Sequence, residues 1–469
     1  MPHDENREVI KKYFLERLDF YKECIIRDIG RLVAMPSVRD ENTIKKNMPF
    51  GEEISRAFDL IKEIADEFSL KCEIFDGYAL HIEYGESTKV VGILTHTDIV
   101  PCGEISKWES DPYVLDLRDG FMYGRGVNDD KASIIGLMYI MRILKEAGYK
   151  PQKKIRLIVG GAEETTWECM KYYLSKNSPP DIAFSPDCDF PVVNCEKGIL
   201  RGELRKNIKI SKASTHKLVG IQCYKSHDFA LNHIVVEIET KDYAAIEICA
   251  KGASRVCLDG DIATVEYISN KNLSRNPQRS PHAACDFFED FSHLSNIDEA
   301  LKNILYIIGK WFPQKPFGES IGISYTHQET GYLTMALCYL SYSLGELAMG
   351  FDIRYPAGIE EDYILKKLSL QAEEDKLSVQ VIQRRERLYI PSDSYLVKTL
   401  LDSYETVMGE HPAPVTKGGA SYSRAIPNCV GFGPTFAGET PNSHKENECM
   451  SVESFFKALE IYLEAILRL

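Results

Sequence analysis

Residues 130–160 read DKASIIGLMYIMRILKEAGYKPQKKIRLIVG and decide the fold class of this chain. Residues 130–147 carry apolar side chains at helical spacing, and Gly148 follows at a position where helices commonly end. After a short polar connection, residues 154–160 form an apolar run of strand length. The stretch therefore predicts a helix followed by a buried strand, the repeating unit of an α/β sheet.

The same alternation extends outward from this stretch. Apolar runs predict strands at 72–75, 79–84, 90–95 and 181–184, and residues 168–174 predict a helix. Strands that alternate with helices indicate a sheet covered by helices. Further helices are predicted at 7–34, 53–68 and 451–469.

The pattern changes after about residue 198. Residues 200–285 contain short alternating segments around a predicted helix, and residues 319–354 again predict strands. From Pro391 the α/β pattern resumes. We therefore predict an outer α/β domain, a mixed sheet flanked by helices, that is interrupted by an inserted α+β domain. The predicted boundaries are 1–194 and 389–469 for the outer domain and 195–388 for the insert.

Composition excludes several classes of protein. The 469 residues are 44% hydrophobic and 27% charged, as in globular chains, and the net charge of −14 comes without a long basic cluster, so we expect no nucleic-acid partner. No apolar stretch reaches the roughly 18 residues of a membrane span, and the N-terminus lacks the apolar core of a secretion signal. Thirteen cysteines without a C-x-x-C pair indicate free thiols and a cytoplasmic location.

Polar side chains follow several predicted strands. The run LTHTDIVP ends with His96 and Asp98, and GGAEETTW brings Glu163 and Glu164 to the end of another strand. Asp187 follows a third strand in SPD. Sites form at the carboxyl ends of strands in α/β sheets, although each motif alone also fits a polar turn.

Two further motifs precede helices. GRGVNDDKA carries Asp129 and Asp130, and its glycine spacing matches no phosphate-binding loop, so we reject nucleotide binding. An aspartate at a helix start can also be a simple cap. SHKENE brings His444 to the start of the last helix. Imidazole and carboxylate groups in this number could hold two metal ions, with one carboxylate shared between them.

As an ordered set, HTDIVP, GRGVNDDKA, EET-x-W, SPD followed by EKG, and SHKENE resemble the M20 family of metallopeptidases. GGASYSR and DIRYP are similar to its PepV-like dipeptidase subgroup, and the resemblance spans about residue 10 to 469. It implies a zinc-peptidase-like catalytic domain with an inserted lid domain and two Zn²⁺ ions per chain. Mn²⁺ or Co²⁺ would also suit such ligands. The subgroup further implies a monomer rather than a dimer.

The resemblance assigns the metal ligands. One ion would be bound by His96 and Asp187, and the other by Glu164 and His444. Asp129 would bridge the two ions.

The resemblance also assigns residues around the ions. Asp98 would orient His96, and Glu163 would be the general base, which leaves Asp130 with a capping or surface role. Arg354 resembles the lid arginine that grips a substrate carboxylate, a task that suits arginine, and Arg424 is retained near the site.

Two lid contacts depart from the family pattern. Tyr224 stands where the family has an asparagine. Leu273 stands at the lid histidine in the register that we favour, whereas an alternative register keeps His282. Loss of both contacts would mean a changed substrate, a slow enzyme or binding without turnover.

The implied activity is metal-dependent hydrolysis of amide bonds in small carboxylate-bearing substrates, first of all dipeptides. A water bridging two zinc ions would attack, with Glu163 as the base. An N-acyl amino acid deacylase of the same fold is an alternative, because fold and metals do not fix the substrate. A metal-binding protein with little or no catalysis is the third reading.

Overall fold

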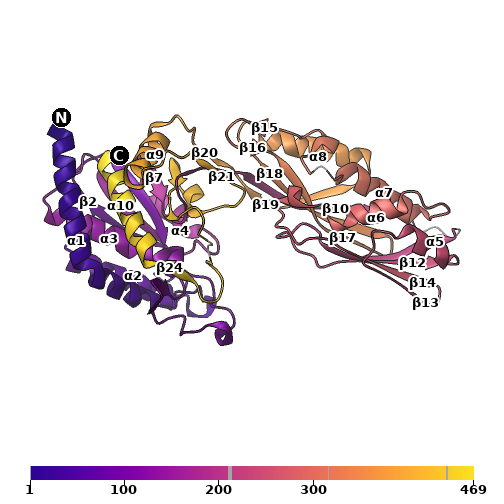
Figure 1. Cartoon of the computed structure of the whole chain (residues 1–469), viewed down its shortest axis with the longest axis horizontal. Coiled ribbons are helices and arrows are strands. Elements are labelled where there is room, and N and C mark those ends of the chain that lie inside the picture. The colour runs from indigo at the N-terminus through magenta and orange to yellow at the C-terminus, as the bar shows by residue number, and fades with distance from the viewer. Residues whose placement is uncertain (1, 210–213, 315, 440–441) are drawn as a thin grey trace. The chain divides into compact units, whose positions relative to one another are not determined.

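The computed structural model describes residues 2–209, 214–314, 316–439 and 442–469 (Figure 1). The chain divides into two compact units. Unit 1 comprises Met1–Asn194, Ile390–Val415 and Ala420–Leu469, and unit 2 comprises Cys195–Tyr389 and Thr416–Gly419. Each unit has its own hydrophobic core. Their roles as catalytic domain and lid stay predictions.

Unit 1 is built on a mixed sheet, as the sequence predicts. Its strands β3, β6, β7 and β22 are parallel, whereas β1 and β2 pair antiparallel at one edge. In spatial order the strands are β1 (Lys71–Phe75), β2 (Ala79–Tyr84), β6 (Lys154–Gly160), β3 (Val90–His96), β7 (Ile182–Ser185), β22 (Cys429–Gly431) and β9 (Val193–Glu196), which continues from unit 1 into unit 2. In unit 2, β20 (Leu388–Tyr389) pairs with the end of β9, and β21 (Val415–Lys417) also pairs with β9.

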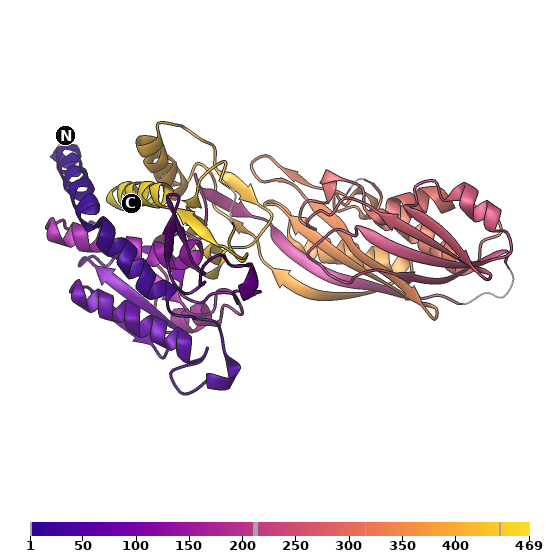
Figure 2. The same ribbon diagram turned by 60° about the horizontal axis from the view of Figure 1, so that its bottom comes forward.

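Helices flank this sheet (Figure 2). Helix α3 (Ala132–Glu146) packs against β3 and β6, and it is buried along most of its length because it is apolar on nearly all sides. Helices α1 (Pro2–Val33) and α10 (Val452–Arg468) pack on α3, and α9 (Tyr395–Met408) packs on α10. On β1 and β2 lie α2 (Glu52–Glu67) and α4 (Glu168–Lys176).

A small antiparallel sheet joins distant parts of unit 1. It consists of β24 (Cys449–Ser451), β5 (Phe121–Tyr123) and β4 (Asp116–Arg118), in that order. A parallel pair of short strands, β8 (Cys188–Asp189) and β23 (Pro434–Thr435), makes a second link. The C-terminal segment is thereby fixed to the first half of the chain.

Unit 2 contains an antiparallel sheet with helices. Burial alternates along β12, β14 and β19, so one face of the sheet packs on the core there, whereas β17 and β18 are buried along nearly their whole length. The spatial order is β13 (Arg255–Asp259), β14 (Ile262–Ile268), β12 (His233–Thr240), β11 (His216–Gln222), β17 (Thr334–Ser343), β18 (Glu346–Tyr355), β10 (Gly198–Asn207) and β19 (Ser378–Arg385). Two short strands, β15 (Thr326–His327) and β16 (Gly331–Tyr332), pair with each other outside this sheet. The helices are α5 (Tyr243–Cys249), α6 (Ala283–Phe291), α7 (Glu299–Trp311) and α8 (Glu361–Glu374).

The sequence prediction for this unit is incomplete. It omits α6 and α7, although α7 buries apolar side chains at helical spacing and is capped by Asp298. It also extends strand structure over residues 319–354, whereas long strands begin only with β17. All thirteen cysteines are free thiols, as expected. In the described ranges, no helix is both long and apolar enough to cross a membrane.

Gly160, at the end of β6, leaves space for a neighbouring tyrosine. A Cβ atom at this position would overlap the Tyr422 hydroxyl. We expect Gly160→Ala to lower the free energy of unfolding by about 1–3 kcal/mol, the usual cost of overpacking, as measured by urea denaturation. Gly30→Ala is the control, because a Cβ there meets Leu115 only at an ordinary 3.5 Å. Equal stability of the two variants would contradict this packing.

Candidate metal centre

Parallel strand pairing brings the polar motifs together. His96, the last residue of β3, pairs with Gly160 of β6, and the Thr97 N–H donates to the Gly160 carbonyl at 2.9 Å. The chain beyond β3 therefore runs beside the chain that carries Glu163 and Glu164. Strand β7 lies on the other side of β3 and leads to Asp187.

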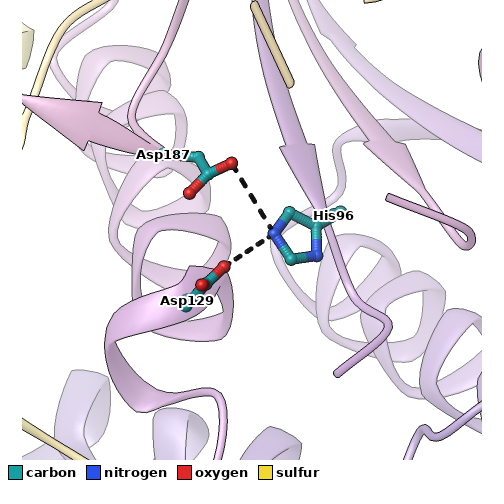
Figure 3. A group of neighbouring side chains, drawn as sticks. All are labelled: His96, Asp129 and Asp187. Atoms are coloured by element: carbon teal, nitrogen blue, oxygen red, sulfur yellow. Dashed lines mark hydrogen bonds and ion pairs between the residues drawn. The ribbon is translucent and has the colours of Figure 1, made fainter. Parts of the chain in front are cut away.

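The first group of potential ligands consists of His96, Asp129 and Asp187 (Figure 3). His96 Nε2 lies 2.9 Å from Asp129 Oδ1 and 3.9 Å from Asp187 Oδ2. Figure 3 shows both carboxylates turned toward this one ring nitrogen. His96 Nδ1 is 2.9 Å from the Asp98 carbonyl oxygen, which can only accept a hydrogen bond. Nδ1 therefore donates to this oxygen, which leaves Nε2 facing the two carboxylates. Burial lowers the pKa of His96, but hydrogen bonds to Asp129 and Asp98 raise this pKa well above its usual range. A cation between Nε2 and the carboxylates would take the place of the Nε2 proton.

The second group consists of Asp129, Glu164 and His444. His444 Nε2 lies 2.8 Å from Glu164 Oε1 and 3.1 Å from Asp129 Oδ2. Asp129 thus directs one oxygen at each histidine and belongs to both groups. Within each group the potential ligand atoms lie within 4.8 Å of one another. The structure therefore brings the five predicted ligands together around one shared carboxylate.

Negative charge accumulates around these groups. Burial raises the pKa of Glu163 to about 8, with further increases from the charges of Glu164 and Asp129. Burial also raises the pKa of Asp187 well above its usual range. Hydrogen bonds to Asp129 and Glu164 raise the pKa of His444 to about 11. Carboxylates outnumber imidazoles, so divalent cations held by nitrogen and oxygen ligands fit this donor set.

Asp98 has a wider role in this structure than the predicted orientation of His96. Its buried carboxylate accepts the backbone N–H groups of Glu163 and Glu164, each at 3.0 Å. One carboxylate oxygen also lies 3.5 Å from His96 Nδ1. Asp98 therefore holds the turn that presents both glutamates.

Asp130 does not have the predicted capping or surface role. Its side chain is fully buried, and burial raises its pKa to about 7. Asp129 and Asp130 have non-helical backbone angles, and α3 begins only at Ala132. The loop turns inward before the helix starts, so Asp130 points into the protein. Neighbouring Lys131 is also buried and donates to the Met35 carbonyl at 2.6 Å.

The two arginines proposed for substrate binding lie in different units. Arg354, in unit 2, is only 4% exposed; its Nε and Nη2 donate to Asp352 at 2.7 Å, and its Nη1 donates to the Gly418 carbonyl at 2.6 Å. A substrate carboxylate would compete with these bonds. Arg424 follows Tyr422 in a short helical turn of unit 1. Both substrate-binding roles stay predictions.

The lid segments singled out by the sequence pair with each other inside unit 2. Phe229 forms a β-bridge with Leu273, which is 38% exposed. Tyr224 is 83% exposed. His282 is engaged elsewhere, because its Nε2 lies 3.0 Å from the Phe312 carbonyl oxygen and so donates to it. Which register holds stays a prediction.

Sequence reasoning missed Tyr422 as a residue of the centre. Its ring packs edge-on to His96, with the ring centroids 5.8 Å apart, and its hydroxyl lies 3.0 Å from Cys169 Sγ. This ring contact restrains the orientation of the imidazole. The motif GGASYSR contains the signal, but we used it only for the resemblance.

Known proteins resemble this chain in sequence and in fold. Residues 92–468 match the model of peptidase family M20/M25/M40. The chain belongs to this peptidase family. "Putative dipeptidase YtjP" of Bacillus subtilis is 28% identical, and its alignment covers 96% of this chain and 97% of that relative. "Putative dipeptidase SSP1012" of Staphylococcus saprophyticus is 26% identical, with 97% of this chain and 98% of that relative covered.

Solved structures share the fold. Human carnosine dipeptidase 1 aligns with a TM-score of 0.57 at 13% identity, and the dipeptidase Dug1p of Saccharomyces cerevisiae with 0.56 at 12%. Each alignment covers 98% of both chains. The predicted fold class and family are therefore confirmed.

We expect Glu163 to lower the stability of the metal-free protein as the pH rises from about 4.5 to about 8. Its pKa is about 8 in the folded state against 4.5 ordinarily, so its favourable contribution is complete below pH 4.5 and is lost as the pH rises through 8. We expect Glu163→Gln, freed of metal with a chelator, to melt at a higher temperature than metal-free wild type above pH 8. Near pH 4.5 this gain should disappear. Exposed Glu453, changed to Gln, is the control; a gain independent of pH would contradict the assignment.

Proposed function

We propose that this chain is a dipeptidase that uses two zinc ions to hydrolyse the amide bond of small carboxylate-bearing peptides. The observation that supports two ions is Asp129, whose oxygens are directed at His96 and His444 separately. The relatives named as dipeptidases align over nearly the whole chain and support the substrate class.

The proposed ligands follow the two groups. His96 and Asp187 hold one ion, Glu164 and His444 hold the other, and Asp129 bridges them. Bound zinc would polarise the scissile carbonyl and lower the pKa of a shared water. Mn²⁺ or Co²⁺ would also suit this mixture of imidazole and carboxylate ligands.

Glu163 is proposed as the general base. It belongs to neither ligand group, yet it is adjacent to the ligand Glu164 and shares the turn held by Asp98. A carboxylate at this place can accept a proton from water and pass it to the leaving amine. By fixing the backbone of both residues, Asp98 holds Glu163 in place as the proposed base and Glu164 as the proposed ligand.

The two alternatives differ from this proposal in the substrate and in turnover. An N-acyl amino acid deacylase would use the same centre. A binding protein without turnover is favoured by Leu273, which cannot donate a hydrogen bond to a developing oxyanion, and by Tyr224, which can do so only through its phenol. Intact Glu163 favours catalysis, because metal binding alone needs no base.

A substrate screen with Glu163→Gln tests the proposal. We expect purified wild type with zinc to hydrolyse dipeptides faster than N-acetyl amino acids. Glu163→Gln should lose at least roughly 10²-fold in kcat, the usual loss for a missing general base, and should keep its zinc content. Metal analysis by mass spectrometry accompanies the assay. Retained activity, or zinc loss in this variant, would refute the role of Glu163, and a preference for acyl substrates would support the deacylase.

The shared carboxylate gives a separate prediction about metal content. Asp129→Ala should lose both ions, since Asp129 belongs to both groups. Asp187→Ala should lose chiefly the first ion and His444→Ala chiefly the second. The zinc content of each variant, measured after dialysis against a weak chelator, checks this order. If Asp129→Ala keeps one ion at full occupancy, the bridging role is wrong.

A further inference from the structure

Glu448 lies directly before β24, at the point where the C-terminal segment meets the loop that carries Asp129. Its side chain is 1% exposed. Antiparallel pairing of Cys449 with Tyr123 brings the start of β24 next to the end of β5. The Gly124 N–H donates to the Glu448 carbonyl at 3.0 Å. The β5–β24 ladder thus places a buried carboxylate inside the Asp129 loop.

Both carboxylate oxygens of Glu448 bind this loop. Oε1 accepts the backbone N–H groups of Asn128 at 3.0 Å and Asp129 at 3.3 Å. Oε2 accepts Arg125 Nη1 at 2.6 Å. Because the group bound at Asp129 is its backbone N–H, Glu448 fixes the backbone from which the Asp129 carboxylate extends.

Arg125 balances the charge of Glu448. It is 2% exposed, its guanidinium lies over the Trp108 ring with 5.3 Å to the centroid, and its backbone N–H donates to the Pro112 carbonyl at 2.8 Å. A buried carboxylate that lacks a partner is strongly destabilising, and Arg125 supplies the charged partner of Glu448 at this buried position.

The same ladder also fixes the segment that carries His444. Asn128 Nδ2 donates to Ser443 Oγ at 2.8 Å, which joins the Asp129 loop to the residue before His444. Asn442 closes the turn, because its Nδ2 donates to the Asn447 carbonyl at 2.7 Å and its Oδ1 accepts the Cys449 N–H at 3.0 Å. Glu448 therefore stands where both ligand segments are joined.

We propose that Glu448 is a positioning residue that sets the place of Asp129 and thereby controls the affinity of both metal positions at once. The inference rests on the proposed dinuclear centre. A residue that only stabilises the fold would, on substitution, change the free energy of unfolding but not the metal affinity of the folded protein. Substitution of Glu448 should change that affinity.

The test compares Glu448→Gln with Glu453→Gln, an exposed glutamate on the first turn of α10. The glutamine keeps the volume of Glu448 but replaces one carboxylate oxygen by an N–H₂ group. This group cannot accept a hydrogen bond from Arg125 or from the backbone N–H groups of the loop. We expect zinc affinity, measured by competition with a chromogenic chelator well below the melting temperature, to fall roughly 10–100-fold at both positions. The control should bind zinc like wild type. Glu448→Asp, which keeps the charge, should recover part of the affinity.

Amide hydrogen exchange gives a second readout that needs no activity. Exchange at Asn128 and Asp129 should accelerate in metal-free Glu448→Gln, while the core of unit 1 keeps its protection. Unchanged affinity at both positions, or weakening at one position only, would overturn the proposal. If Glu448→Gln binds zinc more weakly at both positions while wild type cleaves no dipeptide, the positioning role of Glu448 would be supported and the proposed function refuted. A wild type that binds no zinc would refute both.

Discussion

The parallel pairing of β3 with β6 is the constraint on which the candidate centre depends. It sets His96 opposite Gly160, so Asp98 reaches the backbone amides of Glu163 and Glu164 within one turn beyond the strands. Side chains alternate between the faces of a sheet, so a shift of one residue in β3 would turn His96 to the opposite face. The small residue at position 160 is part of the same constraint, because it leaves room for the tyrosine ring that packs on His96.

Charge balance connects this geometry to binding. Carboxylates packed around Asp129 repel one another, and burial raises the pKa of Glu163 to about 8 and that of Asp187 well above its usual range. Cations and protons therefore compete for the same groups, and metal binding is coupled to proton release. Lys131 and Arg125 are buried nearby, but they are directed to Met35 and Glu448 rather than to the ligand groups.

Sequence periodicity predicted the elements whose burial is local and regular, such as β2, β6 and α2. The motifs also predicted which side chains gather, because strand ends in a parallel sheet share an edge. Asp130 was misplaced because the inward turn of its loop leaves no periodic signal. Glu448 was overlooked because its partners, Arg125 and Asn128, are distant in sequence and meet it only through the β5–β24 ladder. Helices α6 and α7 were missed although their apolar spacing was readable.

Unit 1 is discontinuous, and this has a consequence for how the protein matures in a cell. A ribosome makes His96, Asp129 and Asp187 early, then all of unit 2 up to Tyr389, and only afterwards His444. The first trio of ligands is thus synthesised well before the second is complete. In the proposed centre, the ligands of the first position are therefore all made before unit 2, whereas the second position lacks His444 until the last part of the chain is made. The later position can be filled only once nearly the whole polypeptide has been made.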